Sequence, residues 1–114
     1  MQIFSQNGVS EKTNYLVRQA QEKAMSGDHR TAVEYLKKVI SIDPSHSGAF
    51  AMLGDCTDCL GHHEEAIAYY DQALRIDPYH ADAWFNKGMS LKSIGRGREA
   101  TECIEKSVEL YCGR

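Results

Sequence analysis

Apolar residues along this chain recur at helical spacing, and the pattern repeats every 34 residues. Three large apolar residues are each followed four positions later by a small one: Leu16, Phe50 and Trp84, then Ala20, Gly54 and Gly88. A second series has the opposite order, with an alanine before each large residue: Ala32, Ala66 and Ala100, then Leu36, Tyr70 and Ile104. Because residues four apart share one helix face, each period predicts two helices that pack small side chains against large ones.

Glycine and proline mark where these predicted helices end. A glycine stands between the two helices of every period, at positions 27, 61 and 95, and glycine readily adopts the left-handed conformation that ends a helix. The tripeptide Ile-Asp-Pro at 42–44 recurs at 76–78, and helices seldom continue past the residue before a proline. The predicted helices span 13–26, 30–42, 47–60, 63–76, 81–94 and 97–111. We see no run of alternating β-branched residues and therefore predict an all-α chain.

The 34-residue unit resembles the tetratricopeptide repeat, a pair of helices with a recurring Trp-Leu-Gly-Tyr, Ala-Phe, Pro pattern. The middle unit fits best, through Phe50, Leu53, Gly54, Ala66, Tyr70, Ala73 and Pro78. The resemblance implies a right-handed α-solenoid of three repeats, at 13–46, 47–80 and 81–114, with no separate C-terminal capping helix. Residues 1–12 are then an N-terminal tail or an extension of the first helix. Five positions depart from the pattern, since Gln19 and Lys87 replace leucine, Lys23 and Thr57 replace tyrosine, and Cys112 replaces proline.

The resemblance also implies a binding site, because the first helices of such repeats line a concave groove that holds peptides or helices of partner proteins. The corresponding positions here are Asn14, Val17, Arg18, Gln21, Met52, Asp55, Asp58, Asp82, Phe85, Asn86, Met89 and Lys92. Spacings of three, four and seven place them on one helical face. Some relatives grip a terminal carboxylate with lysine, asparagine and arginine, but the matching positions hold Val17, Gln21, Met52, Asp82 and Asn86. We therefore expect that clamp to be absent.

Composition and charge narrow the class of partner. The chain has a formal charge of -3 and a pI near 5.9, which disfavours nucleic acid as a partner. It has no apolar run approaching the roughly 20 residues that span a bilayer, so no membrane partner is expected. The first twelve residues lack the features of a secretory signal and the four cysteines have no export signal, which indicates the cytoplasm.

The middle repeat is the most acidic part of the chain. Only Arg75 opposes its carboxylates, which are Asp55, Asp58, Glu64, Glu65, Asp71 and Asp77. The predicted groove also carries an adaptable apolar strip of Met25, Met52, Phe85 and Met89, because methionine repacks around varied partners. Together these features favour a partner segment that mixes apolar and basic residues.

Two functions remain open at this stage. The leading hypothesis is a non-catalytic scaffold or adaptor that binds a partner peptide or helix in the groove. The alternative is a structural module that forms a homodimer through its uncapped last helix, where Ile104, Val108 and Leu110 would be exposed, or an excised fragment of a larger repeat protein. Light scattering tests the homodimer, which a clean monomer at high concentration would exclude. Substitution of Met52 and Asn86 separates the two functions, because a groove binder would lose its partner and keep its assembly state.

Other chemistry in the sequence has a simpler structural explanation. Cys56-x-x-Cys59 followed by His62 and His63 is reminiscent of a metal site, but glycine 61 ends the helix between the two pairs. Histidines recur in register at 29 and 63 and at 46 and 80, so the repeat explains them better than acid–base catalysis. The aromatic residues that could stack on nucleic-acid bases lie largely at repeat positions that are predicted to be buried in the core. We expect no metal, no cofactor and no catalytic residue.

Overall fold

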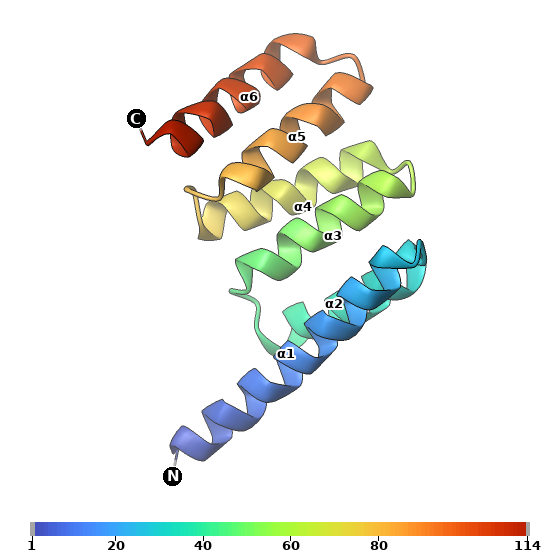
Figure 1. Ribbon diagram of the computed structural model, residues 1–114, viewed down its shortest axis with the longest axis vertical. Helices are drawn as coiled ribbons and strands as arrows, with labels where there is room; N and C mark the ends of the chain where they lie inside the picture. Colours follow the sequence, from blue (N-terminus) through green and yellow to red (C-terminus); the bar gives the residue numbers. More distant parts are fainter. Residues whose placement is uncertain (1, 114) are drawn as a thin grey trace.

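The computed structural model describes the backbone of residues 2–113 and the side chains of residues 10–113. Within those residues the chain forms six α-helices and no strand, which confirms the predicted all-α class. The helices are α1 (Gln2–Met25), α2 (His29–Ile42), α3 (Ser47–Cys59), α4 (His63–Ile76), α5 (Ala81–Ser93) and α6 (Gly97–Cys112) (Figure 1). The backbone of α1 begins at Gln2 rather than near residue 13, so the N-terminal segment continues the first helix.

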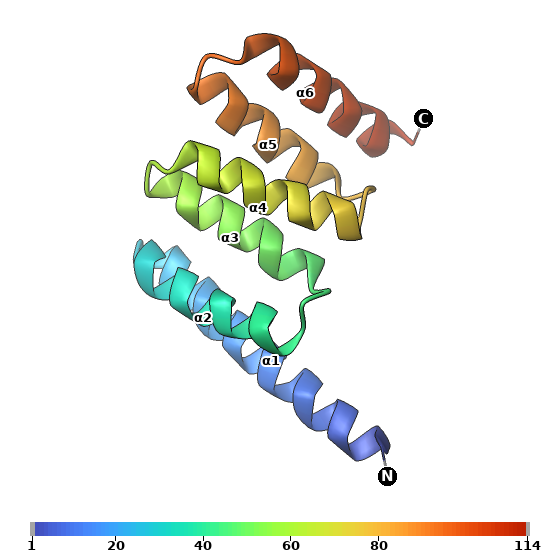
Figure 2. The same ribbon diagram turned by 180° about the vertical axis from the view of Figure 1, so that it is seen from behind.

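Consecutive helices pair as α1 with α2, α3 with α4, and α5 with α6, and the three pairs stack along the long axis of the molecule (Figure 1). In the first two pairs the first helix faces the viewer in Figure 1, with α1 in front of α2 and α3 in front of α4, and the order is reversed in Figure 2. In the third pair α6 also lies towards the viewer in Figure 1. Neighbouring pairs meet where α2 packs on α3 and α4 packs on α5, and α3 also contacts α5. The expected solenoid of stacked helix pairs is therefore confirmed.

The turn within each helix pair depends on its glycine. Gly27, Gly61 and Gly95 have φ angles of 90°, 88° and 82°, in the left-handed region that side chains disfavour. Each of them follows the end of the first helix in its pair and lets the chain reverse within a few residues. This agrees with the sequence prediction at all three positions.

Small and large residues meet between paired helices as the 34-residue pattern predicts. A Cβ atom added at Gly54 would lie 2.6 Å from the ring of Tyr70, and one added at Gly88 would lie 2.8 Å from Ile104. Ala20, the equivalent residue in the first pair, is fully buried in the same cluster as Leu36. The helices of each pair can approach closely because one of them lacks side-chain bulk at this point.

The contact with Gly88 corrects one expectation about the last helix. Ile104 packs inward against α5 and does not lie on the uncovered face of α6. Val108 fits that face better, since it is 52% exposed, whereas Leu74, its counterpart in α4, is only 8% exposed. Leu110 is half-buried. The helix runs on to Cys112, where the earlier repeats have proline, and ends at Gly113 with φ 74°.

Histidine side chains cap two of the first helices, which the sequence analysis did not anticipate. Nδ1 of His46 accepts a hydrogen bond from the backbone N–H of Ala49 at 3.0 Å, and Nδ1 of His80 accepts one from Ala83 at 3.2 Å. Each satisfies a backbone donor that the first turn of a helix leaves unpaired. The repeated histidines at 46 and 80 therefore have a structural role at the start of α3 and α5.

Replacing His80 by alanine is expected to lower the free energy of unfolding by about 0.5–2 kcal/mol, the usual cost of losing an N-cap. His80→Asn should retain most of the stability, because asparagine caps equally well. His62 provides the matched control, since it stands before α4 but makes no side-chain cap bond. Urea unfolding should find His62→Ala close to the native chain, and an equal loss in both alanine variants would contradict the capping role.

Candidate functional site

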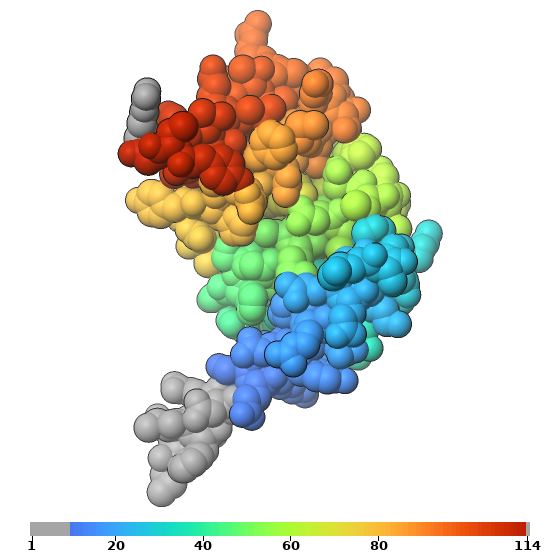
Figure 3. Space-filling model, viewed as in Figure 1, coloured from blue at the N-terminus to red at the C-terminus, as the bar shows by residue number. Residues whose placement is uncertain are grey.

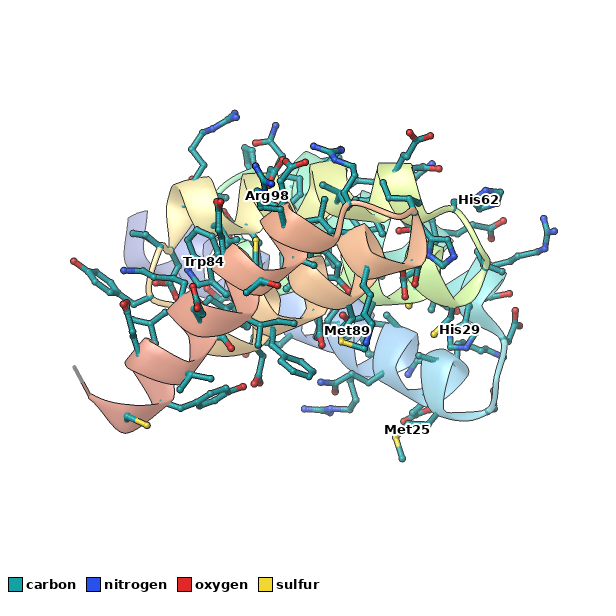
Figure 4. All side chains as sticks on the ribbon, turned by 90° about the horizontal axis from the view of Figure 1, so that it is seen from above. Met25, His29, His62, Trp84, Met89 and Arg98 are labelled. Atoms are coloured by element: carbon teal, nitrogen blue, oxygen red, sulfur yellow. The ribbon has the colours of Figure 1, made fainter. Side chains whose placement is uncertain are left out.

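The candidate site is the layer formed by α1, α3 and α5. Parts of all three helices lie on the face of the molecule seen in Figure 3, where α6 lies beside α5. Met25 of α1 and Met89 of α5 both lie on this side, and Arg98 of α6 lies on the opposite side (Figure 4). The exposed surface of this layer, from Asn14 to Lys92, is called the first-helix face below.

In α1, three of the four predicted groove residues are exposed. Asn14, Arg18 and Gln21 reach solvent, whereas Val17 is half-buried and packs against the core cluster beneath α1 and α3. Met25, at the end of the helix, is 87% exposed. This part of the face is therefore polar, with an isolated apolar side chain at one end.

In α3, two aspartates link neighbouring helices instead of standing free. Oδ1 of Asp55 accepts hydrogen bonds from the hydroxyl of Tyr70 at 2.5 Å and from the amide of Asn86 at 3.1 Å. Desolvation raises the pKa of this carboxyl, although both hydrogen bonds oppose the shift. Burial and the nearby Asp55 carboxylate also raise the pKa of Tyr70. Asp55 thus joins α3 to both α4 and α5.

Asp58 makes a second connection one turn further along α3. Its Oδ1 accepts a hydrogen bond from the hydroxyl of Ser90 at 2.6 Å and lies 2.6 Å from Nδ1 of His63. Ser90 is fully buried, so this carboxylate satisfies a hydroxyl that water cannot reach. Asp55 is exposed and Asp58 is half-buried, so both carboxylates reach the surface while they are hydrogen-bonded within the protein.

In α5, the exposed apolar side chains of the face come together. Phe85 and Met89, one turn apart, are each 41% exposed, and Lys92 is exposed beyond them. Asp82 accepts a hydrogen bond from the hydroxyl of Tyr111 in α6, and Asn86 donates to Asp55 as described above. Met52 of α3 is half-buried against the core. The accessible apolar surface is thus centred on α5.

Sequence reasoning missed the partners of these polar groups. The hydroxyls of Tyr70, Ser90 and Tyr111 belong to other helices, and only the stacking of the pairs brings them to the aspartates. No short motif carries such contacts. One signal did exist, since position 90 carries a buried serine where the preceding repeat has the buried Cys56, and a buried hydroxyl needs a partner.

Three of the hollows in the described part of the chain have volumes of about 350, 320 and 320 Å³, two of them beside His62 and one beside Cys103. No predicted groove residue lines any of these three.

The Cys56-x-x-Cys59 motif is divided between core and surface. Cys56 is buried in the cluster that contains Leu53, and burial raises the pKa of its thiol to about 11. Cys59 is exposed, and His63 is bound to Asp58. Among the residues that the structure describes, no three His, Cys, Asp or Glu side chains are placed to hold a metal ion.

A search for membrane-spanning segments found none among the described helices, since none of them combines the necessary length and hydropathy.

Family comparisons agree with the 34-residue register. Two sequence profiles of the tetratricopeptide repeat match the chain, one over residues 17–81 and the other over residues 69–103. No curated protein matches the chain.

Several solved structures share the fold. MamA superposes with a TM-score of 0.83 at 22% identity over 88% of this chain, which spans 58% of the MamA chain. The second repeat domain of Spaghetti (RPAP3), bound to the HSP90 peptide SRMEEVD, gives 0.88 at 19% identity over 93% of this chain and 97% of its own. The chaperone SycD of Yersinia enterocolitica gives 0.87 at 23% identity, over 92% of this chain and 78% of its own. At these identities the likeness shows the fold alone.

Proposed function

The chain belongs to the tetratricopeptide repeat family, and from this premise we propose that it is a non-catalytic scaffold that holds a partner peptide or helix on its first-helix face. The observation that carries the proposal is the pair of exposed apolar side chains, Phe85 and Met89, beside a row of polar groups on α1, α3 and α5. Exposed apolar surface rimmed by polar residues is typical of protein-binding sites. The Spaghetti domain and SycD have each been solved with a peptide, which supports the same use of this fold.

The proposed partner segment combines apolar and basic residues. Its apolar side chains would contact Phe85 and Met89, which are already partly desolvated by their neighbours. Its basic side chains would face Asp55, Asp58 and Asp82. The hydroxyl and amide groups that donate to these carboxylates are neutral and bring no positive charge of their own. Charge complementarity then selects basic over acidic partners.

A terminal carboxylate is not the proposed ligand. The five matching positions offer no lysine or arginine, and Asp82, held by Tyr111, would repel an anion. We therefore expect the peptide SRMEEVD, which the Spaghetti domain binds, to show no measurable affinity for this chain. Saturable binding of that peptide would contradict the proposal that the partner segment is basic.

Two peptides that differ only in charge test the proposed chemistry. Both carry the same apolar residues, and one has lysine where the other has glutamate. We expect the lysine peptide to bind at least about tenfold more tightly, which corresponds to about 1.4 kcal/mol. Isothermal titration should also show weaker binding as salt is added, because salt screens exposed charges. Equal affinities for the two peptides would refute the proposed charge preference.

Self-association through α6 is a second candidate function, favoured by the 52% exposure of Val108 where its counterpart Leu74 is covered by α5. In a homodimer through this face, Val108→Glu would place a charge in the interface and yield monomers. Light scattering at high protein concentration measures this directly. A native chain that is already monomeric there would exclude the homodimer and leave the first-helix face as the interaction surface.

A further inference from the structure

A hollow between α5 and α6 lies beside the position at which the other two repeats carry a tyrosine. Position 103 carries cysteine, whereas its equivalents at 35 and 69 are both tyrosine. Tyr69 is half-buried and packs against the core cluster that contains Leu53 and Cys56. Cys103 points into the corresponding cluster of the third repeat and leaves a space of about 320 Å³ beside it.

The walls of this hollow are suited to an aromatic ring. Leu91 and Cys103 form its apolar floor, and the half-buried indole of Trp84 lies along one side. Two lysines and two glutamates also line it, namely Lys87, Lys106, Glu99 and Glu102. Apolar cavities of about 150 Å³ already admit benzene, so the space is sufficient for one ring.

The two lysines indicate an aromatic occupant more specifically. In the first repeat, Nζ of Lys38 lies 5.7 Å from the ring centroid of Tyr35, three residues earlier in the helix. Lys106 is the equivalent of Lys38 in the third repeat. It follows Cys103 by three residues, so it has no aromatic ring where Lys38 has Tyr35. Nζ of Lys87 lies 5.7 Å from the ring of Trp84 and 2.7 Å from Oδ1 of Asp71. A ring in the hollow would lie between cations that favour aromatic faces.

We propose that this hollow binds the phenol ring of a tyrosine side chain from a partner protein, in the place that Tyr35 and Tyr69 occupy in their own repeats. The ring would contact Leu91, Cys103 and Trp84, and its hydroxyl would meet Glu102 or Lys106 at the rim. Burial raises the pKa of the Cys103 thiol, so this residue shapes the floor as a small apolar group. The site is separate from the first-helix face and does not depend on the function proposed for that face.

Trp84 is the only tryptophan in the chain and reports directly on the hollow. N-acetyl-tyrosinamide should change its fluorescence saturably, with a dissociation constant on the order of 1 mM for a single ring. N-acetyl-leucinamide should cause no saturable change. Free 4-methylphenol serves as a third probe, and if it binds at least about tenfold more tightly than the tyrosine amide, the assignment to a tyrosine side chain is wrong.

Two substitutions of Cys103 test whether the change in Trp84 fluorescence comes from binding in the hollow. Cys103→Tyr fills the hollow from within and should weaken the response to the tyrosine amide at least tenfold, whereas Cys103→Ser keeps the space and should respond like the native chain. An undiminished response in Cys103→Tyr would overturn the proposal. NMR of the native chain gives a second test, independent of whether the variant folds. Contacts between the ligand ring and the side chains of Leu91 and Cys103 are expected, and their absence from the saturated complex would also overturn it.

Discussion

Gly54→Ala is expected to lower the free energy of unfolding by about 1–3 kcal/mol, although alanine is the better helix former. The added Cβ would lie 2.6–2.8 Å from three atoms of the Tyr70 ring. That ring is 2% exposed and its hydroxyl is bonded to Asp55, so it cannot move aside without breaking other contacts. Overpacking of this kind costs about 1–3 kcal/mol, which exceeds the gain of up to about 1 kcal/mol in helix propensity.

The first repeat suggests how to rescue this variant. There, Ala20 faces Leu36 at the equivalent positions, and both side chains are fully buried. Gly54→Ala combined with Tyr70→Leu reproduces that pair, so the double variant should be more stable than the sum of the two single changes predicts. Urea unfolding of all four chains measures this coupling. Gly97→Ala is the control, since nothing lies within 4 Å of its added Cβ. A Gly54→Ala chain as stable as Gly97→Ala would contradict the packing argument.

Loss of Phe85 and Met89 together is expected to weaken partner binding at least tenfold while leaving the fold intact. These two side chains form the accessible apolar part of the first-helix face on α5, and apolar anchors at the centre of an interface carry much of the binding energy. Substitutions at such exposed positions usually change stability by less than about 0.5 kcal/mol. The binding loss and the stability of the variant can therefore be separated.

The measurement uses the tightest peptide selected by display against the native chain. Its affinity is compared across the native chain, the Phe85→Ala/Met89→Ala variant and Ile76→Ala. Ile76 is a suitable control because it is 39% exposed, close to the 41% of the two groove residues, but lies at the end of α4. If Ile76→Ala weakens binding as much as the double variant does, the peptide does not use the first-helix face.

The helical architecture could be predicted from sequence because its determinants are local and repeated. A small residue opposite a large one, such as Gly54 opposite Tyr70, recurs every 34 residues, and so does the glycine after each first helix. One alignment of the repeats therefore explains every copy. The chemistry of the face could not be predicted in the same way. Asp58 bonds to Ser90 only because two helix pairs stack. The third repeat has no aspartate at the position equivalent to Asp58, so the repeat pattern does not predict this bond.

Two cases, Ile104 and the pair of histidines at 46 and 80, show where the alignment of the repeats does not predict the role of a side chain. The sequence predicts Ile104 and Val108 on one uncovered face of the last helix. Ile104 is instead the equivalent of Tyr70 and packs inward on Gly88. His46 and His80 lie in turns, as predicted, but they also cap helices, a role more common for serine, threonine, aspartate and asparagine. In both cases the backbone position was correct and the direction of the side chain decided the role.

The central claim is that partner segments bind the layer of first helices. The most direct test is the change in backbone amide NMR shifts of the native chain on titration with the selected peptide. We expect shift changes concentrated on α1, α3 and α5, around Arg18, Asp55 and Phe85. Changes confined to α2 and α4 would refute binding to the first-helix face, because the partner would then lie behind α1 and α3 as seen in Figure 1.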